Sequence, residues 1–144
     1  MKKLSILFVS VLTLGLAVTS CSSDKDDSSA SIEGKWEITH MGAVIGTEEV
    51  LQPYTNEGGC ANDIVEFKAD NKFVDTYAEY SDSKCNTFTE EGTFTKDGNT
   101  LTKKYIGESE KYEIAELSGS KLKLKMTYSE GGISVSAVVV YKKI

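Results

Sequence analysis

The sequence predicts an all-β protein whose domain is an eight-stranded antiparallel up-and-down β-barrel. From residue 88 to residue 143, short amphipathic runs alternate with turns rich in Gly, Asp, Asn and Ser. Alternation is clearest over residues 122–128, where apolar and polar side chains take turns, as expected of a strand with one dry and one wet face. Gly-containing turns between such runs indicate hairpins, and consecutive hairpins make a meander.

Eight segments carry this strand pattern and follow one another along the chain. The predicted strands are 33–40, 62–68, 73–80, 88–95, 100–106, 111–117, 121–128 and 133–141. A long sheet of amphipathic strands twists and tends to close, which removes its exposed edges. Eight strands leave an interior that side chains fill or that holds one small ligand. We therefore expect residues 32–144 to form one barrel domain.

Three segments between or within the strands carry further expectations. Residues 41–59 are predicted to be a long connection with one helical turn near 48–51, and residues 81–87 a loop that carries Cys85. Residues 137–140 are apolar on both faces of their strand. We expect the long connection or an end segment to cover the face that points away from the interior, since an uncovered apolar strand promotes aggregation.

The N-terminus predicts export and lipid attachment. Lys2 and Lys3 precede an apolar run, 4–18, that is too short to span a bilayer, so residues 1–20 are predicted to be a signal peptide. The sequence Val18-Thr19-Ser20-Cys21 resembles the lipobox of bacterial lipoproteins, which implies acylation of Cys21 and cleavage before it. The alternative is an ordinary signal peptide with a cysteine near its end.

Residues 21–31 are polar and acidic, and we expect a flexible tether. Acidic residues after a lipidated cysteine resemble the surface-export signal of lipoproteins in some Gram-negative bacteria. The resemblance implies outer-membrane attachment with the domain exposed at the cell surface. A plain spacer that leaves the domain facing the periplasm is the alternative.

Cys60 and Cys85 remain as an even pair once Cys21 is assigned to lipid. In an exported chain, two such cysteines are predicted to form a disulfide. A reactive cysteine or a metal-binding pair is the alternative, but the chain has a single histidine and no further cysteine to complete a metal site.

Gly34-Lys35-Trp36 at the start of the first strand, followed by a meander, resembles the lipocalins. Residues 32–144 are most similar to the small lipocalin-like domains of bacterial lipoproteins. The resemblance implies that Trp36 plugs the closed end of the barrel, that residues 41–59 form a loop over its mouth, and that the protein binds a small hydrophobic molecule.

The side chains on the inward faces would line any cavity, and several are aromatic, which suits an apolar ligand with one polar end. The candidate ligand-binding residues are Trp36, Phe67, Phe73, Tyr77, Tyr105, Met126 and Tyr128. Two alternatives stay open. These large side chains could fill the interior themselves, and a filled barrel could instead display its loops to a protein or glycan.

Other functional classes find little support. The chain has no arginine and a formal charge of −6, which becomes −8 when residues 1–20 and their two lysines are removed, so nucleic-acid binding is not expected. His40 is the single histidine, and Asp75 and Glu79 are four residues apart on one strand, too far for a catalytic carboxylate pair. We expect a monomeric protein that is not an enzyme and has no metal or cofactor.

Overall fold

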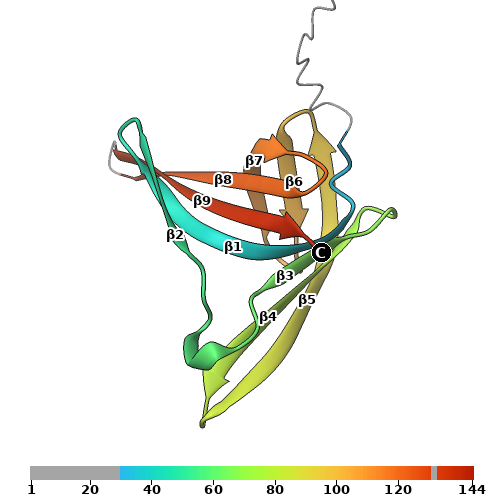
Figure 1. Cartoon of the computed structure of the whole chain (residues 1–144). Helices are drawn as coiled ribbons and strands as arrows, with labels where there is room; N and C mark the ends of the chain where they lie inside the picture. Colours follow the sequence, from blue (N-terminus) through green and yellow to red (C-terminus); the bar gives the residue numbers. More distant parts are fainter. Residues whose placement is uncertain (1–29, 131–132) are drawn as a thin grey trace, which may run out of the picture.

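The domain is a single antiparallel sheet that closes on itself (Figure 1). A computed structural model describes residues 30–130 and 133–144, so the predicted signal peptide, Cys21 and nearly all of the tether lie outside the described residues. The strands are β1 (Gly34–Ile45), β2 (Glu48–Pro53), β3 (Ile64–Phe67), β4 (Lys72–Ser81), β5 (Lys84–Asp97), β6 (Thr100–Lys104), β7 (Ser109–Leu117), β8 (Lys121–Glu130) and β9 (Ile133–Lys143). A 3-10 helix, η2 (Glu57–Gly59), precedes β3. In the described part of the chain, no helix has the length and apolar character that a membrane span requires.

Closure comes from the first strand, which pairs along both of its edges. β3 to β9 follow one another in chain order, and β1 joins β3 to β9. Trp36 of β1 lies opposite Val65 of β3 on one side and opposite Lys143 of β9 on the other. β1 and β3–β9 therefore form the predicted closed eight-stranded barrel, and closure pairs edges that an open sheet would expose.

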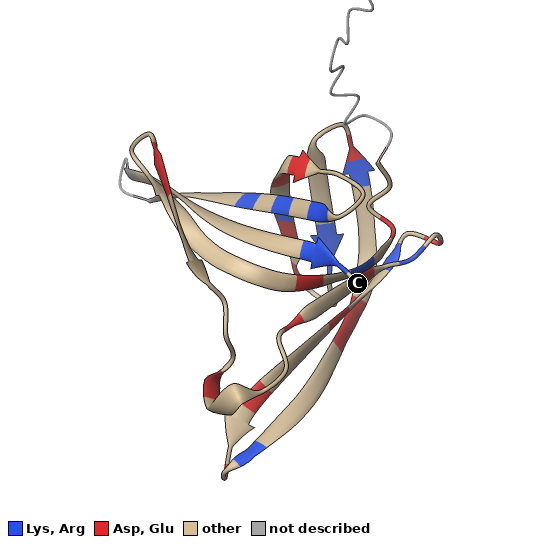
Figure 2. Cartoon of the chain, viewed as in Figure 1, with Lys and Arg blue, Asp and Glu red and all other residues tan. Residues whose placement is uncertain are grey.

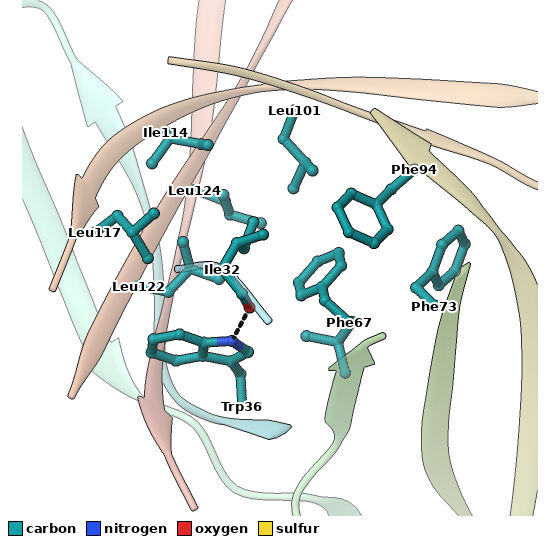
Figure 3. Packing of buried hydrophobic residues seen from close by; sticks show 11 residues of the cluster. Ile32, Trp36, Phe67, Phe73, Phe94, Leu101, Ile114, Leu117, Leu122 and Leu124 are labelled. Atoms are coloured by element: carbon teal, nitrogen blue, oxygen red, sulfur yellow. Dashed lines mark hydrogen bonds between the residues drawn. The ribbon is translucent and has the colours of Figure 1, made fainter. Parts of the chain in front are cut away.

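Apolar side chains fill one end of the barrel (Figure 3). Trp36 is completely buried, and its indole N–H donates to the Ile32 carbonyl oxygen at 2.7 Å, which holds the chain that enters β1 across this end. The rings of Phe67 and Phe94 meet edge to face with centroids 4.9 Å apart, a favourable aromatic geometry. The cluster is completed by Val65, Phe73, Leu101, Ile114, Leu117, Leu122 and Leu124. We call this the filled end.

The prediction of a long connection over residues 41–59 is wrong in its first part. β1 continues to Ile45, and a two-residue turn beginning at Gly46 leads into β2, which pairs with the far half of β1. The predicted helical turn near residues 48–51 is therefore a strand. Gly46 has a φ of 65°, a conformation that glycine adopts without strain, and this allows the chain to reverse at once instead of forming a loop.

β2 lies over the outer face of the far half of the barrel. Glu49 of β2 is paired with Lys123 of β8 at 2.7 Å, although β1 and β9 separate these strands in the sheet, so the β1–β2 hairpin must curl across the outside. Gly42 allows this approach, because a Cβ there would lie 1.8 Å from the Val50 carbonyl oxygen. Val138 and Val140 of β9 point to this face and are 1% and 5% exposed. The expected cover for the second apolar face of the last strand is confirmed.

The β4–β5 hairpin extends beyond its neighbours as a two-stranded arm (Figure 1). β3 pairs with β4 only as far as Thr76, and β6 pairs with β5 only from Thr93 onward, so the arm covers residues 77–92. Cys85 lies in β5 instead of the predicted loop, because β4 and β5 are joined by a tight turn at residues 82–83. The predicted Cys60–Cys85 disulfide is confirmed and ties this arm to the segment after η2.

Candidate ligand site

A cavity of about 230 Å³ lies inside the barrel, next to the filled end. Ile38 and Tyr141 line it from β1 and β9, and Asp75 and Glu90 line it from β4 and β5. Its remaining lining residues are Asp63, Ile64, Val65, Thr76, Tyr77 and Lys103. The cavity is smaller than typical pockets for drug-sized ligands, which hold roughly 300–1,000 Å³. It can therefore hold one end of a ligand while the rest extends along the barrel.

A buried charged group forms one wall of this cavity. Lys103 is only 6% exposed, and its Nζ donates to Asp75 Oδ2 at 2.6 Å. The Tyr105 hydroxyl donates to the same oxygen at 2.8 Å, and the Lys103 ammonium group lies 4.4 Å from the centroid of the Phe73 ring. Opposite charge, a hydroxyl and an aromatic face together compensate for burying an ammonium group. Both hydrogen bonds go to Oδ2, and no donor in the described part of the chain is bonded to Asp75 Oδ1, so this oxygen can accept from a ligand.

Burial, with a further contribution from nearby carboxylates, raises the pKa values of the tyrosines around this interior. Burial, reinforced by the Asp75 carboxylate, raises the pKa of Tyr105 far above its usual value. Burial also raises the pKa of Tyr112 and that of Tyr141, and the Tyr112 hydroxyl donates to Glu110 at 2.6 Å. The phenols consequently stay protonated and serve as neutral hydrogen-bond donors at any physiological pH.

The segment between β2 and β3 is fastened at the rim of the cavity. The Tyr54 hydroxyl donates to Asp63 Oδ2 at 2.8 Å, and Asn56 Nδ2 donates to Asp63 Oδ1 at 2.9 Å. Asp63 Oδ1 also accepts from the Ala78 N–H at 3.4 Å, which joins the segment to the β4–β5 arm. Burial, followed by the Asp63 contact, raises the pKa of Tyr54 to about 12. The predicted loop over the mouth is thus reduced to residues 54–63, and hydrogen bonds and the disulfide hold it.

An exposed apolar surface continues from the cavity along the inner side of β8, β9 and β1. Pairing places Met126, Ala137 and Ala43 in one row across the three strands, and Tyr128 and Val135 in the next. Ile45, Tyr128 and Val135 are 68%, 58% and 48% exposed. We call this surface the mouth face; it consists of Met41, Ala43, Ile45, Met126, Tyr128, Val135, Ala137 and Val139.

The mouth face is exposed because the opposite wall diverges from it. In Figure 1 the β4–β5 arm extends away from the half formed by β8, β9, β1 and β2. On the arm, Tyr77 and Phe88 stack with their ring centroids 5.6 Å apart on the inward side, and Phe88 is 43% exposed. Contiguous exposed apolar surface of this kind generally marks a ligand or partner site in a protein. The two walls and the cavity between them form one amphipathic site.

A second hollow, of about 350 Å³, lies on the outer side of the barrel. It is lined by Leu51 of β2, by Val140 and Lys142 of β9, and by His40 and Thr39 of β1, with Ser120, Lys121 and Tyr141 completing it. The exposed His40 ring, whose Nδ1 is 3.1 Å from the Thr39 hydroxyl, has no carboxylate partner among the described residues. The hollow follows from the curl of β2 over β9, and the charged residues that line it are Lys121 and Lys142.

The structure separates the predicted ligand-binding residues into three groups. Trp36, Phe67 and Phe73 lie in the filled end with 0–1% exposure, so packing occupies them. Tyr77 lines the cavity and Tyr105 belongs to its charged wall. The third group is Met126 and Tyr128 on the mouth face. One half of the barrel is therefore filled by side chains, and the other half contains the cavity.

Sequence reasoning missed Lys103 and Glu90 at the cavity, and it missed β2. Lys103 could have been found, because it stands between Leu101 and Tyr105 in an alternating strand and so must point inward. β2 could not have been found, because its residues 48–53 do not alternate between apolar and polar. Among the described residues, no group of three or more His, Cys, Asp or Glu side chains could hold a metal ion. The arrangement is suited to binding through hydrogen bonds, charge and apolar contact.

Comparison with known proteins agrees with this architecture. Residues 32–124 match the model of a lipocalin-like domain family. Among solved structures, the chain is similar to an uncharacterized protein from Bacteroides eggerthii, with a TM-score of 0.53 and 11% identity over 79% of this chain and 100% of that one. It is also similar to the bovine lipocalin allergen Bos d 2, with a TM-score of 0.47 and 20% identity over 83% of this chain and 75% of that one.

A bovine odorant binding protein, a deswapped triple mutant, has a TM-score of 0.46 and 17% identity over 77% of this chain and 72% of that one. No curated protein matches the sequence. The likeness to the Bacteroides protein extends only to the fold, whereas the family model spans well over half of the chain. The chain belongs to the family of lipocalin-like domains.

Proposed function

We propose that the protein is a monomeric, lipid-anchored lipoprotein of the cell envelope whose barrel binds a small hydrophobic or amphipathic molecule. The observation that carries the binding function is the mouth face, an apolar surface exposed beside a cavity of about 230 Å³. Covering apolar surface with a ligand is favourable by roughly 25 cal/mol per Å². The apolar body of the ligand would lie along the mouth face and its polar end in the cavity.

The test is native mass spectrometry of the mature protein purified from the envelope of its own cells. The strands and the buried core that the structure describes lie within residues 30–144, so we expect the chain from residue 22 onward to stay folded when proteolysis at the tether releases it. A co-purified small molecule that is absent after extraction with organic solvent is the expected result. An empty barrel that also fails to bind apolar probes would overturn the proposal.

The second candidate function is display of the barrel to a protein or glycan partner. The filled end favours it, because a domain stabilised by its own packing needs no ligand to stay folded. The two curled or extended hairpins, β1–β2 and β4–β5, would then supply the contact surface. An empty barrel, together with a partner recovered by cross-linking in intact cells, is the result that would favour this function.

Lipid anchoring and outward exposure rest on residues 1–31. Metabolic labelling with an alkyne analogue of palmitate should label the wild-type protein and leave Cys21→Ala unlabelled. Protease added to intact cells should digest the domain. If the domain faced the periplasm, protease would digest it in lysed cells but not in intact cells. A wild-type protein without acyl label would contradict the anchor without affecting ligand binding.

A further inference from the structure

The charges that line the cavity are unequal in number. Three carboxylates face it, those of Asp63, Asp75 and Glu90, against the single ammonium group of Lys103. Lys103 and Asp75 form a pair at 2.6 Å and cancel each other. Asp63 is held by the uncharged donors Tyr54, Asn56 and the Ala78 N–H. Two negative charges are therefore left over at the cavity.

Glu90 is placed where it repels a neighbour. It lies directly opposite Asp75 in the β4–β5 pair, on the inner side of the sheet. Side chains directly opposite each other in an antiparallel pair stand about 4.5–5.5 Å apart at Cβ, and like charges there are destabilising. Within the described part of the chain, no lysine comes within ion-pairing distance of Glu90, and Lys103 pairs with Asp75 alone. A positive group placed between the two carboxylates would relieve this repulsion.

The tyrosines that face the interior lie close to these carboxylates. Burial is the main cause of their raised pKa values, and carboxylates add to the rise, namely Asp75 for Tyr105 and Tyr141, and Glu90 for Tyr77. These carboxylates would repel an anionic head group, because like charges repel most strongly where water is partly excluded. A fatty-acid carboxylate is thus a poor match for the cavity.

A divalent metal ion is also a poor match. No group of three or more metal-ligating side chains occurs among residues 30–130 and 133–144. An organic ammonium group needs fewer and less regular ligands, because it donates separate hydrogen bonds to separate oxygens. Asp75 Oδ1 and the Glu90 carboxylate are such acceptors, and the Tyr77 ring offers an aromatic face nearby.

The apolar part of the ligand follows from the strand register. Ile38 and Tyr141 line the cavity and lie opposite each other in the β1–β9 pair, and Met41 and Val139 follow on the same face beyond the bulge at Thr39. The mouth face thus begins where the cavity ends. A chain that leaves the cavity in this direction would cover Ala43, Met126 and Val135, which are exposed or half-buried.

We infer that the ligand is a cationic amphiphile: an amine whose positive head lies between Asp75 and Glu90 while its hydrocarbon body lies along the mouth face. This inference deepens the proposed function and rests on it. It names the charge of the ligand, which the family resemblance does not supply.

The test compares three twelve-carbon probes with the same chain and different heads, dodecylamine, dodecanol and dodecanoate, below their aggregation concentrations. Binding to residues 22–144 is measured by displacement of the neutral fluorophore N-phenyl-1-naphthylamine. We expect dodecylamine to bind at least about tenfold more tightly than dodecanoate, with dodecanol between them. A favourable charge contact of about 1.4 kcal/mol corresponds to that tenfold ratio.

Glu90→Gln and Glu91→Gln form a matched pair of variants. The two residues are neighbours on β5 and both are exposed, but Glu90 points inward beside the cavity and Glu91 points outward, opposite Val74. Both substitutions remove one negative charge, so an effect of overall charge would appear equally in both. We expect Glu90→Gln to weaken dodecylamine binding about fivefold or more, to leave dodecanol unchanged, and Glu91→Gln to change neither.

The outcomes separate the inference from the proposed function. Equal binding of the three probes, or equal effects of the two variants, would overturn the cationic head group while dodecanol binding still supports the apolar site. Tighter binding of dodecanoate would overturn it as well. If no probe displaces the fluorophore and the fluorophore itself does not bind, the proposed function fails and the inference fails with it.

Discussion

Lys103 Nζ lies 2.6 Å from Asp75 Oδ2 inside the barrel, where the ammonium group also rests over the Phe73 ring. The side chains of this pair are 8% and 21% exposed, so water screens the interaction only in part. Forming such a pair costs free energy because both charges lose water. Removing one partner destabilises the fold more strongly, because the remaining buried charge has no countercharge. The pair thus joins β6 to β4 across the interior and also determines the charge of the cavity wall.

Lys103→Met should lower the free energy of unfolding by about 3 kcal/mol, because it leaves the Asp75 carboxylate without its countercharge. Urea denaturation followed by the fluorescence of Trp36, the only tryptophan, measures this. Lys104→Met is the matched control, since Lys104 is exposed on the opposite face of β6. The double variant Asp75→Asn with Lys103→Met should recover part of the loss. A Lys103→Met variant as stable as the control would show that the pair contributes nothing.

Gly42→Ala should destabilise the domain by about 1–3 kcal/mol, as overpacking does, since its Cβ would lie 1.8 Å from the Val50 carbonyl oxygen and push β2 off the outer face. Gly119→Ala is the control, because a Cβ there meets nothing within 4 Å. Hydrogen exchange should show faster exchange in β2 and β9 of the Gly42 variant only. Equal stability of the two variants would mean that β2 is free to shift.

Replacing Cys60 and Cys85 together by serine should lower stability by about 3–4 kcal/mol, because 25 residues separate them and the bond restricts the unfolded chain. The structural effect should be local, since an isolated two-stranded ribbon is only marginally stable. Limited proteolysis is therefore expected to cut the variant within residues 54–63 or 77–92 while the filled end persists. Cleavage spread evenly over the domain would contradict this role for the disulfide.

Alkaline pH should destabilise the protein from about pH 10 upward, the usual pKa of an exposed tyrosine. The raised pKa of Tyr54, about 12, means that the folded state retains a proton which the unfolded state has lost, so stability falls between those pH values. Tyr54→Phe should reduce the slope of stability against pH in this window relative to the wild type. Equal slopes in the wild type and the variant would remove Asp63 and burial as the cause.

Much of the fold could be predicted from local pattern alone. Residues 122–128 alternate strictly, and the strand there is β8, with Leu122 and Leu124 buried and Lys123 outside, paired to Glu49. The Cys60–Cys85 disulfide could be predicted by counting the cysteines that remain once Cys21 is assigned to lipid. The missing strand β2 could not be predicted in this way, because residues 48–53 do not alternate between apolar and polar, and they become a strand only by pairing with β1 and covering Val138.

The sequence by itself determined an all-β barrel with an inward and an outward side to each strand, since side-chain alternation and turn residues are local properties of the chain. The tertiary structure decided which inward side chains are packed and which stay available. Trp36 and Tyr128 both point inward, yet one is completely buried and the other is 58% exposed. The reason is that the β4–β5 arm diverges from the opposite wall. This divergence depends on the length over which each strand is paired with its neighbours in the sheet, which the sequence of one strand does not reveal.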